Sequence, residues 1–117
     1  MAVDDEPDVL DLVVMVLKSG GHEVVSAGSG TEALAKYMRD KPDLVLLDVN
    51  MPDMDGHQVL KKMKEMKPDQ KAAFLTVLGV SDAERQAAIK NEGIIDYLRK
   101  PFTPDGLLEK VKECLEK

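Results

Sequence analysis

The feature that most constrains the fold is a regular alternation of short apolar segments with amphipathic ones. Five strand-like segments are each followed by a helix-like segment. The third, DLVLLD at residues 43–48, is apolar without alternation, which is typical of a strand buried on both faces. Five strand–helix pairs in succession predict a parallel sheet with helices on both faces, because each crossover helix returns the chain to the same edge.

The expected strands are residues 1–3, 22–27, 43–48, 72–78 and 96–99, and the expected helices are residues 6–20, 30–40, 56–66, 81–93 and 103 onward. Pro7 suits a first helical turn, whereas Gly20 and Gly93 suit helix ends. The chain has 117 residues, of which 44% are apolar, and contains no internal linker or repeat. We therefore expect one domain over residues 1–117 with a sizeable core.

Charge and cysteine content exclude several classes of protein. The 22 acidic residues outnumber the 16 basic ones, and the net charge of −6 argues against a direct nucleic-acid partner. The one cysteine, Cys114, cannot form an internal disulfide and fits a reducing compartment. No apolar run reaches the roughly 18–20 residues of a membrane span, and no signal peptide precedes the first acids. We therefore expect a cytoplasmic domain without a membrane partner.

Polar side chains gather where the strands are predicted to end, and doubly wound sheets bind their ligands at the carboxyl ends of their strands. The groups at these ends are Asp4 and Asp5 after the first strand, Asp48 at the third, Thr76 near the end of the fourth and Lys100 after the fifth. Any one of them alone would simply mark where a strand reaches solvent. Four of five strand ends at one edge indicate a functional site.

The three acids predict a bound divalent cation, since clustered carboxylates repel one another and a cation relieves that repulsion. A set of oxygen ligands with room for water and phosphate suits Mg²⁺. A carboxylate beside Mg²⁺ can attack a phosphoryl group and form an aspartyl phosphate. The lysine and the hydroxyl would then hold the phosphoryl oxygens, so positioning and charge neutralisation would supply most of the catalysis.

Four motifs, in order along the chain, resemble those of receiver domains in the response-regulator family of two-component signal transduction. They are VDDEP (3–7), LLDVNMPDMDG (46–56), LTVLG (75–79) and YLRKPF (97–102). The resemblance covers essentially the whole chain. It implies an α/β fold of the flavodoxin-like kind, with a doubly wound five-stranded parallel sheet of order 2-1-3-4-5 and five helices.

The resemblance implies that Asp48 is the phosphoacceptor. It implies that Asp5 binds Mg²⁺ directly, that Asp4 does so through water, and that Asn50 supplies a backbone carbonyl to the metal. The metal set is therefore expected to be Asp4, Asp5, Asp48 and Asn50.

The same resemblance assigns Thr76 as the switch hydroxyl, Lys100 as the phosphate-binding lysine and Tyr97 as the switch aromatic. It also implies a cis peptide bond between Lys100 and Pro101, although only about 5–6% of such bonds are cis in folded proteins.

The expected function is a phosphorylation-controlled signalling switch. A histidine kinase or a histidine phosphotransfer protein would donate the phosphoryl group, and an output partner or effector domain of unknown identity would read the result. The domain would catalyse only its own phosphorylation and dephosphorylation, so it is not expected to be a conventional enzyme. A weak homodimer through the fourth helix, fifth strand and fifth helix is also expected, with ion pairs available from Lys90, Arg99, Asp96 and Glu109.

Three departures from the family pattern affect details. The first strand has only three residues before Asp4. Val77 replaces a small residue and is predicted to crowd the phosphoryl site. Ile94 also replaces a small residue and is predicted to affect local packing. A pseudo-receiver that binds partners without phosphate therefore stays open as an alternative.

Two enzyme alternatives stay open as well. GSGTEA (28–33) follows a strand, opens a helix and reads G-x-G-x-x-A, with Asp48 near the spacing of a dinucleotide fingerprint. Ser29 and Glu32 in it also form an S-x-x-E capping box, which accounts for the motif without a ligand. A phosphatase using an aspartyl phosphate would want a second acid at position 50, where the chain has asparagine.

Two further acids, Asp53 and Asp55, follow the predicted phosphoacceptor. They could extend the metal set, but MPDMDG is better explained as a turn in which Gly56 permits a positive φ.

Overall fold

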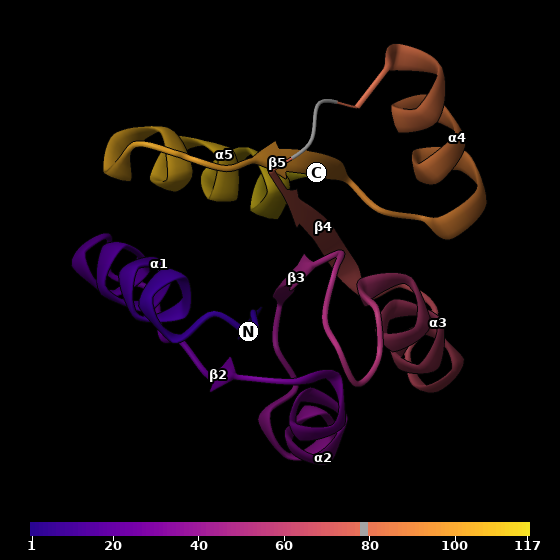
Figure 1. The fold of residues 1–117 in the computed structure, drawn as a ribbon, viewed down its shortest axis with the longest axis horizontal. Helices are drawn as coiled ribbons and strands as arrows, with labels where there is room; N and C mark the ends of the chain where they lie inside the picture. The colour runs from indigo at the N-terminus through magenta and orange to yellow at the C-terminus, as the bar shows by residue number, and fades with distance from the viewer. Residues whose placement is uncertain (78–79) are drawn as a thin grey trace.

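Five parallel strands form one sheet in the order β2-β1-β3-β4-β5, as predicted (Figure 1). The computed structural model describes residues 1–77 and 80–117, so the last two positions of LTVLG lie outside the described residues. The strands are Ala2–Val3 (β1), Ser26–Ala27 (β2), Leu44–Asp48 (β3), Lys71–Thr76 (β4) and Asp96–Arg99 (β5). The helices are Pro7–Ser19 (α1), Gly30–Asp40 (α2), Gly56–Met66 (α3), Asp82–Glu92 (α4) and Pro104–Glu116 (α5). None of the helices in the described part of the chain is long and apolar enough to cross a bilayer.

The helices cover the sheet in two layers (Figure 1). Helices α1 and α5 pack on one face through Val13, Leu107 and Val111, whereas α2, α3 and α4 pack on the other. Phe74 of β4 has no exposed surface and faces the second layer. Ile94 is 2% exposed in the same core, a position consistent with the predicted effect on local packing.

The register of the ladders places the strand ends at one edge of the sheet. Asp48, the last residue of β3, lies opposite Leu75, and Thr76, the last residue of β4, lies opposite Arg99. Val3 at the end of β1 pairs with Leu47. The side chains that follow these strands therefore meet at the same edge.

The prediction for β2 was too long, because a strand needs a partner. Strand β1 supplies only Ala2 and Val3 for pairing, so β2 is limited to Ser26 and Ala27.

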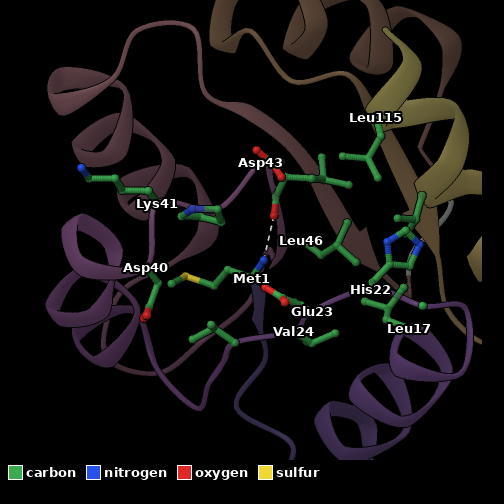
Figure 2. A pocket seen from close by; sticks show the side chains of 15 residues that line it. Met1, Leu17, His22, Glu23, Val24, Asp40, Lys41, Asp43, Leu46 and Leu115 are labelled. Atoms are coloured by element: carbon green, nitrogen blue, oxygen red, sulfur yellow. Dashed lines mark hydrogen bonds between the residues drawn. The ribbon is translucent and has the colours of Figure 1, made fainter.

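At the amino ends of the strands, the space beside β3 forms a cavity of about 410 Å³ (Figure 2). There the Met1 ammonium donates to the Leu44 carbonyl at 2.8 Å, and burial lowers the pKa of that ammonium to about 6. This cavity lies at the edge of the sheet opposite the acids.

Gly56 is required by a close approach of two backbones. It opens α3, and a Cβ atom there would lie 2.6 Å from the Asp48 carbonyl oxygen and 3.2 Å from the Val49 Cα. Its N–H donates to the Val49 carbonyl at 3.0 Å, which closes the loop between β3 and α3. The predicted positive φ at Gly56 is wrong, since the positive-φ glycines among the described residues are Gly21 and Gly93.

We expect the Gly56→Ala variant to lose about 1–3 kcal/mol of unfolding free energy, because the added methyl group must displace the end of β3. Gly28→Ala is the matched control, since a Cβ atom at Gly28 would lie 3.6 Å from the Glu32 carboxylate, an ordinary contact. Urea denaturation of both variants measures the difference. Equal stabilities of the two variants would contradict this role of Gly56.

Candidate metal and phosphoacceptor site

Three carboxylates meet at the carboxyl edge of the sheet. Asp4 and Asp5 directly follow β1, and Asp48 ends β3, so neighbouring central strands bring them together. One ligand oxygen from each of the three lies within 4.8 Å of the others. Asp4 is 1% exposed and Asp48 6%, whereas Asp5 is partly exposed. The sequence prediction of an acidic cluster is therefore confirmed as a geometric fact.

Lys100 reaches these acids from the end of β5. Its Nζ donates to Asp4 Oδ2 at 2.6 Å and lies 3.8 Å from Asp48 Oδ2. The Lys100 N–H donates to the Thr76 carbonyl at 2.7 Å, which ties the lysine backbone to the end of β4. The peptide bond between Lys100 and Pro101 is cis, so that prediction is confirmed.

Burial and like charge raise the pKa of Asp48. Removal from water has the largest effect, the Asp4 carboxylate adds to it, and the pKa rises from an ordinary value of 3.8 to about 6. The Lys100 ammonium and a hydrogen bond from the Asn50 N–H to Asp48 Oδ1 at 3.3 Å act in the opposite direction. With Lys100 as the nearby cation, a fully ionised cluster is therefore disfavoured.

The donor set fits a hard divalent cation. Three carboxylates within 4.8 Å of one another carry more negative charge than the one nearby lysine neutralises. Oxygen donors of this kind, partly open to water through Asp5, match the preference of Mg²⁺. The Asn50 backbone is also at the site, because its N–H bonds to Asp48.

The predicted switch residues lie on the two strands that follow β3 in the sheet, Thr76 on β4 and Tyr97 on β5. Thr76 is buried at the end of β4 and, with Tyr97, lines a cavity of about 240 Å³. The Tyr97 ring is half-buried against Phe74, with ring centroids 5.5 Å apart. Val77, the residue after Thr76, is 58% exposed, and its crowding of the phosphoryl site stays a prediction.

His57 has a structural role that sequence reasoning missed. Its ring packs on Phe74 with centroids 4.7 Å apart, and its Nδ1 is hydrogen-bonded to a Glu92 carboxylate oxygen. This contact joins the start of α3 to the end of α4. Nothing in the spacing of residues 57 and 92 indicates it.

The two further acids of the β3–α3 loop cap helices. Asp55 caps α3 through a capping box with Gln58. Asp53 reaches across to α2, where Thr31 donates to it through both N–H and hydroxyl. The Asp53 carboxylate thus occupies the helix N-terminus that a dinucleotide phosphate would need.

One of the two hydrogen bonds of the predicted S-x-x-E capping box in GSGTEA is present. Ser29 Oγ accepts a hydrogen bond from the Glu32 N–H at 3.1 Å. The Glu32 carboxylate accepts from the Gly28 N–H instead of that of Ser29. Together with the Asp53 cap, this leaves the motif explained without a ligand.

One prediction about the dimer face is wrong. Asp96 is buried and pairs with Arg85 of α4 within the same chain, at 2.8 Å and 3.0 Å through two nitrogens. It also accepts from the Tyr97 N–H at 2.7 Å. Asp96 is therefore already paired within its own chain. The residues left for an ion pair with a second copy are Lys90, Arg99 and Glu109.

Fold and site together define a class of protein: a doubly wound α/β domain with an acidic, metal-compatible cluster and a buried lysine at the carboxyl edge of its sheet. The chain belongs to the response regulator receiver domain family, whose family model matches residues 1–112.

Individual relatives agree with this assignment. The chain is 36% identical over 117 residues to the transcriptional regulatory protein GlrR of Escherichia coli, covering 99% of this chain and 26% of GlrR. It is 36% identical over 119 residues to the alkaline phosphatase synthesis regulator PhoP of Bacillus subtilis, covering 100% of this chain and 48% of PhoP. The chain thus spans about a quarter to a half of the length of these curated relatives.

A solved structure shows the same fold. The chemotaxis protein CheY4 of Vibrio cholerae superposes with a TM-score of 0.88 at 33% identity, covering 97% of this chain and 94% of CheY4. At this level of similarity, the agreement extends over the whole sheet and its helices.

The raised pKa of Asp48 gives a pH-dependent prediction. A carboxyl group whose pKa is higher in the folded state stabilises the fold below its unfolded pKa, and that contribution is lost as pH rises through about 6. We therefore expect Asp48→Asn to exceed the wild type in unfolding free energy at pH 7.5 by up to about 3 kcal/mol. The difference should shrink toward zero at pH 4.

The measurement is urea denaturation in EDTA from pH 4 to 8. Asp11→Asn is the control, because it removes one exposed carboxylate of α1. A difference between Asp48→Asn and wild type that does not change with pH would contradict the raised pKa.

Proposed function

We propose that residues 1–117 form one receiver domain that acts as a phosphorylation-controlled switch with Asp48 as phosphoacceptor. The observation that carries the proposal is the placement of the Asp48 carboxylate, at a rigid strand end, between two further acids and 3.8 Å from the Lys100 ammonium. A nucleophile needs this fixed position, and a transferring phosphoryl group needs cations around it. The family assignment supports the same reading.

The residues that would hold Mg²⁺ are Asp4, Asp5, Asp48 and the Asn50 backbone carbonyl. When bound, the ion would neutralise the acids and the oxygens of the transferring phosphoryl group. Lys100 would hold a phosphoryl oxygen, since its ammonium already lies beside Asp48. Asp4 now accepts a hydrogen bond from Lys100, so that bond has to weaken before the lysine can turn to the phosphoryl group.

The proposed reaction is a phosphoryl transfer from a histidine side chain. An oxygen of the ionised Asp48 carboxylate forms a bond to phosphorus as the phosphorus–nitrogen bond breaks. The electron pair leaves on the imidazole nitrogen, which takes up a proton. Because Asp48 must be ionised to attack, neutralisation of its neighbours favours the reaction.

The phosphoryl group would then change the balance between two arrangements of the domain. Thr76 and Lys100 would move toward the new oxygens, and Tyr97 would repack in the space beside Thr76. Conversion of a mostly inactive population to a mostly active one needs a differential stabilisation of roughly 3–5 kcal/mol.

The proposed partners follow from the family. A histidine kinase or a histidine phosphotransfer protein would supply the phosphoryl group, and an output domain or protein would respond to it. GlrR and PhoP are transcriptional regulators longer than this chain, which supports an output by a separate part or partner. A weak homodimer through α4, β5 and α5 remains part of the proposal, with Lys90, Arg99 and Glu109 as its ion-pairing residues.

Labelling with acetyl phosphate tests the proposal. We expect one phosphoryl group per chain in the presence of millimolar Mg²⁺, stable in acid and labile in base as an acyl phosphate is. Asp48→Asn keeps the shape of the side chain but removes the nucleophile, so the label should vanish while the fold survives. Phosphate-affinity electrophoresis and intact-mass spectrometry measure the label.

Two further variants make the result specific. Asp5→Asn should be phosphorylated slowly, and its rate should recover at higher Mg²⁺. Lys100→Ala should be phosphorylated but should not show the change at Tyr97. A wild type inert to both acetyl phosphate and beryllofluoride would favour the pseudo-receiver alternative. In that case, labelling gained by Val77→Ala would identify Val77 as the obstacle.

A further inference from the structure

The loop between β3 and α3 carries Asn50 to the acidic site and is closed at its base. Asn50 donates its N–H to Asp48 Oδ1, and the Gly56 N–H bonds back to Val49. Six residues, 50–55, lie between Val49 and Gly56. The geometry of this loop therefore decides where the Asn50 backbone lies relative to Asp48.

Asp53, near the tip of this loop, is bound to a different element. It accepts hydrogen bonds from the Thr31 N–H at 3.0 Å, the Thr31 hydroxyl at 2.8 Å and the Gly30 N–H at 3.3 Å. These three donors form the N-terminus of α2, where the helix dipole favours a negative charge. The hydrogen bonds from Thr31 lower the pKa of Asp53, so the carboxylate is ionised at neutral pH.

Packing reinforces the same contact. Gly30 lies so close to the loop and to α3 that a Cβ atom there would be 3.0 Å from the Met54 Cβ of the loop and 2.7 Å from the Val59 Cγ2 of α3. Met51, at the other side of the loop, is 8% exposed and belongs to the core. Among the residues that the structure describes, the hydrogen bonds between positions 50–55 and α2 all involve Asp53.

We propose that Asp53 is a positioning residue that fixes the β3–α3 loop on α2 and thereby holds the Asn50 backbone in place for a divalent cation at the acidic site. The inference rests on the proposed function, because it concerns the affinity of the same site for Mg²⁺. It assigns Asp53 a role distinct from that of a metal ligand, since its carboxylate is occupied by α2.

The test compares three variants by amide chemical-shift titration with MgCl₂. Asp53→Ala removes the acceptor, and we expect it to raise the Kd for Mg²⁺ by about threefold to tenfold, at or below the effect of outer-shell partners in metal sites. Asp53→Asn keeps one acceptor oxygen, which can still accept both Thr31 hydrogen bonds, but it loses the charge and the acceptor for the Gly30 N–H, so it should stay within about twofold of the wild type. If both variants raised the Kd for Mg²⁺ equally, the cause would be the long-range effect of the lost negative charge and not the lost attachment to α2. That result would overturn the proposal.

Ser29→Ala is the matched control. It removes the cap that Ser29 gives α2 through the Glu32 N–H, whereas the hydrogen bonds from α2 to the loop come from Gly30 and Thr31. We expect it to destabilise the same helix end while leaving the Kd for Mg²⁺ unchanged. A Kd raised as much by Ser29→Ala as by Asp53→Ala would show a general effect of α2 stability and would overturn the proposal.

A second readout needs no metal. In EDTA, amide hydrogen exchange of residues 50–55 should be faster in Asp53→Ala than in wild type and Ser29→Ala, because the loop has lost its attachment to α2. Unchanged exchange together with an unchanged Kd would refute the positioning role while leaving the proposed function intact. A wild type that does not bind Mg²⁺ would instead refute the proposed function and this inference with it.

Discussion

The arrangement of the site depends on the contact between the Lys100 ammonium and the Asp4 carboxylate, 2.6 Å apart in a place with almost no solvent. Asp4 and Asp48 are both buried, and their mutual repulsion would be costly without a cation beside them. Lys100 supplies one positive charge to the pair and reaches it because β5 ends in register with β4. Lys100 thus offsets part of the repulsion between the two acids, while burial and the Asp4 charge still raise the pKa of Asp48.

This partial offset of the repulsion between Asp4 and Asp48 connects the fold to the proposed switch. The sheet fixes the acids and the lysine at one edge, whereas the residues that would report phosphorylation lie on the adjoining strands. Two features hold the β3–α3 loop in place without taking part in the chemistry: the close packing of Gly56 on the end of β3, and the Asp53 cap on α2. A structure that positions few ligands precisely suits Mg²⁺, which keeps several of its waters.

Most of the fold and the central site were predictable from the sequence, because both follow from periodicity and chain order. The alternation of strands and helices fixes a parallel sheet, and a parallel sheet brings Asp4, Asp48 and Lys100 to one edge. What was not predictable depends on contacts between segments far apart in the chain. The short β2 reflects the length of β1, and neither the Asp53 cap on α2 nor the Arg85–Asp96 pair leaves a periodic signal.

The central claim is that Lys100 leaves Asp4 when a cation and a phosphoryl group enter the site. The direct measurement is a crystal structure of the domain with Mg²⁺ and beryllofluoride on Asp48. We expect a metal among Asp4, Asp5 and Asp48, with the Lys100 ammonium bonded to a fluoride of the beryllofluoride group and no longer to Asp4. Lys100 still paired with Asp4 at the distance seen here, with no metal between the acids, would contradict this claim.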